Sequence, residues 1–265
     1  MEQVIKMDNV SWKREGKEIL HDIHWHVNKQ EHWAVLGLNG AGKTSLLNMV
    51  NGYIWPTTGE VSVLGKRFGH TDIHQLRKSI GWVSAAIGQR VNERHLAEEI
   101  VISGKYASVG LVFQEPTEAD KEKAFYLMKQ MNIDHVIGKV YAKCSQGERQ
   151  KILIMRALMA DPALLILDEP TTGLDFISRE DLLATVGEFA RKPDAPTIIF
   201  VTHHIEEILP IFSQTLLIGD GTIFAQGDRE QMLTSEKLST LYGRDISVSW
   251  QDGRAWMTLR DVKKV

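Results

Sequence analysis

The chain has 265 residues, of which 43% are hydrophobic and 25% are charged, a composition typical of a globular protein with a sizeable core and room for about two domains. The formal net charge of −3 gives no broad basic field, so no nucleic-acid partner is expected. A single cysteine excludes an internal disulfide framework and fits a reducing compartment. No apolar run approaches the roughly 20 residues that span a bilayer, so work at a membrane is expected to need another, spanning protein.

The N-terminal part of the sequence predicts strands, turns and one helix. Ile23, Trp25 and Val27 alternate with histidines, as in a strand with one buried face. A helical pattern covers residues 45–50. Short apolar runs that predict further strands lie at 33–36, 61–64 and 80–83.

A mostly helical insert is expected over residues 86–144, where strand signals fade. Thr117 and Asp120 stand at the spacing of a capping box, which marks the beginning of a helix. Apolar residues then recur at the spacing of one helical face; they are Ala124, Leu127, Met128 and Met131.

Beyond this insert, residues 164–167, 198–201 and 216–218 form short apolar runs with helical segments between them. That alternation predicts a largely parallel sheet with crossover helices. In the tail, alternating residues 246–250 precede Asp252-Gly253, which is typical of a β-hairpin. The hairpin either packs on its own domain or pairs with another subunit or partner.

Residues 37–44 match the phosphate-loop pattern G-x-x-x-x-G-K-[ST]. Its glycines allow several backbone N–H groups to face one anion, and the following helix directs its positive end to the same point. Lys43 can reach the β- and γ-phosphates, and Thr44 can offer its hydroxyl to Mg²⁺. The alternative is a glycine-rich turn with an unrelated lysine, which the flanking strand and helix disfavour. The nucleotide-binding residues predicted here are Gly37, Asn39, Gly40, Ala41, Gly42, Lys43, Thr44 and Ser45.

Asp168 and Glu169 end the apolar run 164–167. In a doubly wound sheet, ligands bind at the carboxyl ends of the strands. Asp168 would hold Mg²⁺, and Glu169 would orient or deprotonate the attacking water. The alternative is a strand that simply ends in two solvated acids.

The order of these motifs resembles the nucleotide-binding domain of ABC ATPases over roughly residues 2–230. Between phosphate loop and acids lies Cys144-Ser145-Gln146-Gly147-Glu148; after the acids come residues 172–175 (Thr-Gly-Leu-Asp) and Thr202-His203. The resemblance implies an α/β P-loop NTPase of ABC type, with a mostly parallel core sheet, an antiparallel β subdomain and a helical insert. It assigns residues 1–85 and 145–235 to the ATP-binding core, 86–144 to the helical signature subdomain and 236–265 to a C-terminal extension.

The resemblance also implies site roles. The signature residues Ser145, Gln146, Gly147 and Glu148 would face ATP held by the opposite subunit, with the Ser145 hydroxyl and the Gly147 N–H on its γ-phosphate. Asp175 would cross the dimer interface and couple the two sites. His203 would contact the γ-phosphate, and Trp12 would stack on adenine. The plainer alternatives are that Ser145 is only an N-cap, Trp12 a core residue and His203 a surface residue.

Two departures from the family pattern stand out. The signature commonly reads L-S-G-G-Q, and here Cys144, Gln146 and Glu148 replace three of its residues. The family also places a glutamine that contacts Mg²⁺ after the strand at 80–83, whereas this chain has Ala85 there. Gln89 would replace that glutamine as a Mg²⁺ contact if the loop is longer.

The resemblance predicts a Mg²⁺-dependent ATPase that works as a homodimer or with a related ATPase subunit. ATP-driven closure of that dimer would energise a separate multi-spanning membrane subunit, at the inner, cytoplasmic face of the cell membrane. The alternative is a soluble ABC ATPase with a regulatory or remodelling role not coupled to transport. An unrelated P-loop kinase or GTPase is a third hypothesis, against which Ser145 and His203 argue.

Overall fold

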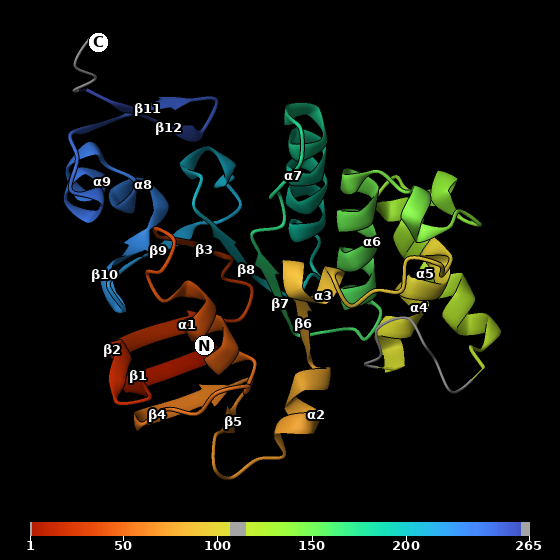
Figure 1. Ribbon diagram of the computed structural model, residues 1–265, viewed down its shortest axis with the longest axis horizontal. Coiled ribbons are helices and arrows are strands. Elements are labelled where there is room, and N and C mark those ends of the chain that lie inside the picture. Colours follow the sequence, from red (N-terminus) through yellow and green to blue (C-terminus); the bar gives the residue numbers. More distant parts are fainter. Residues whose placement is uncertain (1, 107–114, 261–265) are drawn as a thin grey trace. The chain divides into compact units, whose positions relative to one another are not determined.

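The computed structural model describes residues 2–106 and 115–260 (Figure 1). The chain divides into two compact units, one made of Met1–Leu76 with Thr197–Val265 and the other of Arg77–Pro196. Within the described ranges, no helix has both the length and the hydropathy needed to cross a membrane. Residues 107–114 of the predicted helical insert lie outside the described part. The division into core, helical subdomain and C-terminal extension stays a prediction.

An antiparallel sheet in the first unit has the strand order β2-β1-β4-β5. Ile23, Trp25 and Val27 are fully buried on one face of β2, which confirms the predicted alternation. Glu15 and Gly16, both with positive φ, turn the chain from β1 into β2. The strands are β1 Gln3–Arg14, β2 Lys17–Asn28, β4 Thr58–Val63 and β5 Lys66–Arg67.

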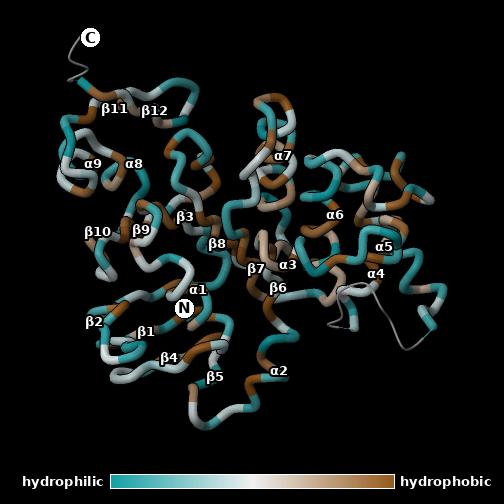
Figure 2. The backbone as a smooth tube through the Cα atoms, in the orientation of Figure 1, coloured by the Kyte–Doolittle hydropathy of each residue, from teal (hydrophilic) through white to brown (hydrophobic). Residues whose placement is uncertain are grey.

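The same unit contains the parallel strands that lead to the phosphate loop. β3 (Trp33–Leu36) lies between β8 (Thr197–Thr202) and β9 (Gln214–Gly219) and is parallel to both. Every residue of β3 and β8 is buried, as expected for strands covered on both faces. Figure 2 shows the hydrophobic colour along these strands. β10 (Thr222–Asp228) pairs antiparallel with β9, and α1 (Lys43–Val50) follows β3 across the phosphate loop.

The C-terminal strands β11 (Ile246–Gln251) and β12 (Arg254–Leu259) form the hairpin that the alternating pattern predicted. Asp252 and Gly253 both have positive φ, as a two-residue hairpin turn requires. The hairpin packs on its own unit, because the Ser239 hydroxyl accepts the Ile246 N–H at 2.9 Å. α8 (Arg229–Met232), α9 (Ser235–Tyr242) and the 3₁₀ turn Ile205–Glu207 (η4) complete this unit.

The second unit combines the parallel pair β6–β7 with several helices. Thr117 and Asp120 form the predicted capping box of α5, in which the Asp120 carboxylate accepts the Thr117 N–H at 3.0 Å. Gly104, the C-cap of α4, lies so close to α6 that a Cβ on it would be 1.8 Å from the Arg156 carbonyl oxygen. The elements from α2 onward are α2 Ile73–Lys78, β6 Ile80–Val83, α3 Ala85–Gly88, α4 Ala97–Ser103, α5 Glu118–Gln130, α6 Gln146–Leu158, β7 Leu164–Asp168 and α7 Phe176–Ala190, with 3₁₀ turns at Gly104–Tyr106, Asp134–Val136 and Tyr141–Lys143.

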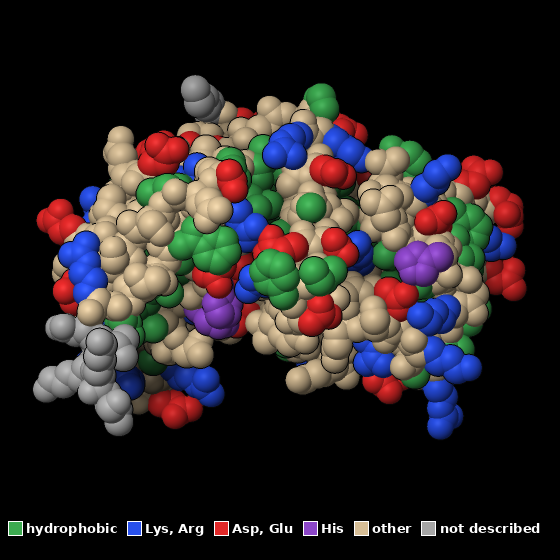
Figure 3. Space-filling model, turned by 90° about the horizontal axis from the view of Figure 1, so that it is seen from above, with side chains coloured by type: hydrophobic (Ala, Val, Ile, Leu, Met, Phe, Trp, Pro, Cys, Tyr) green, Lys and Arg blue, Asp and Glu red, His purple; other side chains and the backbone are tan. Residues whose placement is uncertain are grey.

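Acidic and basic side chains are interspersed on the face drawn in Figure 3, with hydrophobic side chains between them. This mixture agrees with the nearly balanced counts of 31 basic and 34 acidic residues.

Candidate functional site

The phosphate loop is an open turn between buried strand β3 and helix α1. Gly40 and Gly42 have φ of +83° and +104°, a region that L side chains rarely adopt. Lys43 bends back over the loop, and its Nζ donates to the carbonyl oxygens of Gly37 at 2.7 Å and Leu38 at 3.2 Å. The lysine thus lies across the loop in which a phosphate would be bound, with only 6% of its surface exposed.

Close packing beneath the loop explains its other glycine. A Cβ on Gly37 would lie 2.4 Å from the Ile218 carbonyl oxygen in β9, so only glycine fits there. The Gly221 N–H donates to the Ala41 carbonyl at 3.0 Å, which ties the loop to the β9–β10 turn. The loop is therefore held in place by neighbouring main chain as well as by its own sequence.

Trp12 lies in β1, opposite Leu20 of β2, and Leu20 reaches the phosphate loop, since its Cδ2 would be 3.1 Å from a Cβ on Gly42. Trp12 is partly exposed and does not belong to the buried core. The structure thus places an aromatic ring with an accessible surface on a strand pair that contacts the loop. Its stacking on adenine stays a prediction.

His203 follows β8 directly and shares a cavity with the phosphate loop. The cavity has a volume of about 400 Å³, and Leu38 and Asn39 form part of its wall. The end of α9 and the C-terminal hairpin supply most of the other lining residues. Burial raises the pKa of Tyr242, at the end of α9, to about 12, so its phenol stays neutral. The remaining lining residues are Arg244, Ile246, Met257, Thr258 and Leu259. The structure therefore brings His203 and the phosphate loop to one cavity, and it adds the C-terminal hairpin, which no motif indicated.

Of the two predicted acids, Asp168 is the last residue of β7, in the second unit, and Glu169 follows it. Leu164 to Leu167 are buried, and Asp168 and Glu169 are partly exposed at the carboxyl end of the strand. Glu169 has a φ of +50°, a left-handed conformation that is costly for a residue with a long side chain. Such conformations persist where the surroundings fix them, often at functional sites.

The donor types predicted for Mg²⁺ suit that ion. Thr44, in the first turn of α1, offers a hydroxyl oxygen, and Asp168 offers a carboxylate. Mg²⁺ prefers oxygen ligands and usually combines one or two protein groups with substrate phosphates and water. Among the described residues no group of three or more His, Cys, Asp or Glu could hold a metal by itself.

Ser145 is the N-cap of α6, and its hydroxyl accepts the Glu148 N–H at 3.2 Å. This is the plainer of the two roles considered for Ser145, and it leaves the hydroxyl proton to donate to an anion. Gln146 is exposed in the first helical turn, and Gly147 is buried there beside Ser178 of α7. The first N–H groups of a helix lack intrahelical acceptors, so this helix end could bind an anion.

Glu148 completes the capping box and holds the signature in shape. Its carboxylate accepts the Ser145 N–H at 2.6 Å and pairs with Lys139 at 2.9 Å and His135 at 3.0 Å. Burial raises the pKa of Glu148, but these hydrogen bonds outweigh burial and bring the pKa down to about 2. The substitution of the family's common glutamine by Glu148 therefore gives this segment a charged internal clamp.

Replacing Glu148 by Ala is expected to lower the free energy of unfolding by about 1–2 kcal/mol at pH 7. Because the folded pKa lies below the ordinary value, the stabilisation is full above about pH 4.5 and is lost as the pH falls towards 2. Urea unfolding at pH 7 and pH 3.5 measures this, with the exposed Glu122→Ala as the matched control. An equal loss for Glu148→Ala at both pH values would contradict the clamp.

Asp175 caps α7. Its carboxylate accepts two hydrogen bonds from Ser178, one from the Ser178 N–H at 3.0 Å and one from the Ser178 hydroxyl at 2.7 Å. Hydrogen bonds from Ser178 lower the pKa of Asp175, so it stays ionised. The next two residues, Phe176 and Ile177, are 61% and 64% exposed. The role of Asp175 across a dimer interface stays a prediction.

The segment after β6 is a short helix rather than an extended loop. Ala85 begins the short helix α3, and Gln89 stands at its C-cap, exposed. Gln89 therefore lies one helical turn, about 6 Å, further from the strand than Ala85. The Mg²⁺ contact proposed for Gln89 stays a prediction.

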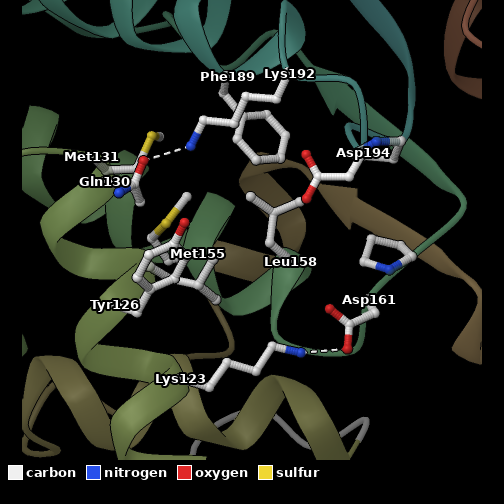
Figure 4. A pocket seen from close by; sticks show the side chains of 13 residues that line it. Lys123, Tyr126, Gln130, Met131, Met155, Leu158, Asp161, Phe189, Lys192 and Asp194 are labelled. Atoms are coloured by element: carbon white, nitrogen blue, oxygen red, sulfur yellow. Dashed lines mark hydrogen bonds and ion pairs between the residues drawn. The ribbon is translucent and has the colours of Figure 1, made fainter.

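A second cavity, of about 450 Å³, lies between α5, α6 and α7 and contains none of the predicted site residues. Lys123 pairs there with Asp161, and Lys192 donates to Gln130 (Figure 4). Lys123 is thus ion-paired, and the carboxylates of Asp161 and Asp194 line the cavity, which makes it a poor phosphate site.

The chain is similar to known proteins over most of its length. A family model described as ABC transporter matches residues 20–172. The chain is 50% identical to an uncharacterised ABC transporter ATP-binding protein of Bacillus subtilis, YlmA, over 96% of this chain and 97% of that protein. In fold, it is similar to a part of an ABC transporter complex from Clostridium perfringens, with a TM-score of 0.77 and 23% identity over 91% and 94% of the two chains. It is also similar to a dimeric ATP-binding cassette bound to ADP and phosphate, with a TM-score of 0.71 and 21% identity over 85% and 98%.

Proposed function

Because this chain belongs to the family of ABC transporter ATP-binding proteins, we propose that it hydrolyses ATP as a head-to-tail dimer and thereby energises a separate membrane-spanning subunit. The observation that carries the proposal is the preformed phosphate loop, with Lys43 lying across it and His203 on the same cavity. A dimeric cassette among the structural neighbours supports the assembly. The place of action proposed is the inner face of the cell membrane.

In the proposed mechanism, each ATP lies between the phosphate loop of one subunit and the Ser145 helix end of the other. Lys43 exchanges its two carbonyl partners for phosphate oxygens, and the N–H groups of the loop surround the same anion. Trp12 stacks on the adenine. These contacts position the nucleotide and neutralise its charge, which is most of what phosphoryl transfer requires.

The chemical step then depends on Glu169 and His203. Glu169 orients the attacking water and accepts its proton, while His203 contacts the γ-phosphate. Mg²⁺, held by Thr44 and Asp168, would neutralise charge that develops on the phosphates. Loss of the γ-phosphate removes the bridge between the subunits, and the dimer reopens.

The test is to purify the tagged chain in mild detergent with Mg-ATP and to identify what remains bound. A stoichiometric multi-spanning protein, and hydrolysis of ATP that EDTA abolishes, are expected. Recovery of a soluble homodimer or soluble complex alone would favour the regulatory alternative, which the transporter names of the relatives do not support. A strict preference for guanine nucleotides would contradict the adenine contact of Trp12.

A further inference from the structure

Two buried residues, Thr202 and Glu207, hold the loop that carries His203 at the end of β8. The Thr202 hydroxyl donates to the Glu207 carboxylate at 2.6 Å and accepts the His204 N–H at 3.0 Å. Thr202 and Glu207 are each 1% exposed. A buried, satisfied pair of this kind fixes main-chain position, so the inner side of the loop is rigid.

The outer side of the loop is held by the C-terminal hairpin. Arg254, the first residue of β12, donates from Nε to the Glu206 carbonyl oxygen at 2.7 Å. The Arg254 guanidinium also lies over the Trp256 ring, 5.8 Å from its centroid. A charged donor on a main-chain acceptor is among the stronger hydrogen bonds, and Glu206 is only three residues after His203.

The hairpin is itself fastened to the body of its unit. The Arg229 guanidinium lies over the Trp250 ring at 5.0 Å and donates to the Gly253 carbonyl at 2.5 Å, next to the hairpin turn. Arg229 is 7% exposed, and its own N–H donates to the Ser213 carbonyl at 2.9 Å. The hairpin that carries Arg254 is therefore held in place by Arg229.

The hairpin lines the cavity that His203 shares with the phosphate loop. Met257 and Leu259 of β12 line the same cavity as His203 and Asn39. We propose that the C-terminal hairpin is a positioning element of the ATPase site and that Arg254 is the positioning residue that holds the His203 loop through the Glu206 carbonyl. This inference rests on the proposed ATP hydrolysis and adds to it a role for a segment beyond the matched family region.

The expected effect is on the chemical step rather than on ATP binding. A shift of about 1 Å in a catalytic group can cost roughly 100-fold in rate. Arg254→Ala is therefore expected to lower kcat about 10- to 100-fold and to change the KM for ATP less than about threefold, because Lys43 and Trp12 keep their positions. Arg254→Lys keeps a charged donor and should restore part of kcat, but the ammonium cannot reproduce the geometry of the guanidinium.

The experiment compares wild type, Arg254→Ala, Arg254→Lys and the control Arg260→Ala, which removes an exposed arginine just beyond β12. Steady-state hydrolysis gives kcat and KM, and hydrogen–deuterium exchange follows residues 203–207 and the phosphate loop. Faster exchange at 203–207 alone, with the drop in kcat, supports the proposal. An unchanged kcat, or a higher KM for ATP without a lower kcat, overturns the proposal.

The exchange readout separates this inference from the proposed function. If wild type fails to hydrolyse ATP, the proposed function is wrong. Unchanged exchange at residues 203–207 in Arg254→Ala, by contrast, refutes the positioning role of Arg254 whether or not ATP is hydrolysed. If Arg254→Ala does not fold, Arg254→Lys carries the same measurements; wild-type kcat and exchange in that variant would show that the guanidinium is not needed.

Discussion

Glu169→Gln is expected to lower kcat for ATP hydrolysis by about 10²–10⁴-fold, the usual contribution of a positioned general base. Glutamine has the same size and keeps the hydrogen-bonding reach of the side chain, but it cannot accept a proton from water. Because the carboxylate is proposed to act on water rather than on the nucleotide, ATP affinity should stay within about threefold. Single-turnover hydrolysis and equilibrium binding measure the two quantities separately.

The same substitution should trap the proposed dimer with ATP bound. Binding can still close the dimer, but the γ-phosphate that bridges the subunits is no longer removed. Light scattering after gel filtration with saturating Mg-ATP should therefore find a dimer for Glu169→Gln. The control is Glu188→Gln, an exposed residue on α7, which should behave as wild type. A Glu169→Gln chain that stays monomeric with ATP bound would argue against the sandwich.

Lys43→Ala is expected to weaken ATP binding by at least about 100-fold. The lysine is buried against the loop that it spans, so its charge sits where the β- and γ-phosphates would lie. Hydrogen bonds to charged groups contribute about 1.5–3 kcal/mol each, and a triphosphate offers more than one acceptor. Titration calorimetry with ATP and with ADP measures the loss, which should be larger for ATP.

The matched control for that experiment is Lys17→Ala, which removes an exposed lysine at the beginning of β2. It should bind ATP as wild type does, which excludes a general effect of lost positive charge. Wild-type affinity in Lys43→Ala would show that the phosphate loop is not the main nucleotide site, and the proposed mechanism would then be wrong.

The parts of the fold that depend on local rules could be predicted from the sequence. Alternating burial in 23–27 and the Thr117 capping box are set by neighbours within a few residues, so a short pattern carries the information. The Asp252-Gly253 turn was predictable for the same reason, because both residues tolerate positive φ. The phosphate loop and the acids after β7 follow motifs whose chemistry restricts the residue types.

Contacts between distant segments could not be predicted in the same way. No pattern connects Arg254 with the Glu206 carbonyl, since any residue offers a carbonyl and only the fold brings these two together. The clamp of Glu148 on Lys139 and His135 is similar, because its partners lie outside the signature. The short helix at Ala85 also escaped prediction, since four residues are too few to show helical periodicity.

The position of β3 has a consequence for how the chain folds as it is made. Trp33 pairs with Ile199 on one side and with Gln214 on the other, so both neighbours of β3 are synthesised long after it. At about 5–20 residues per second, β3 waits roughly 10 to 40 s for them. During that time an apolar strand has two open edges, which are sites for wrong pairing. The nascent chain should therefore depend on chaperones until β8 and β9 have left the ribosome, and slower translation should lower the soluble yield.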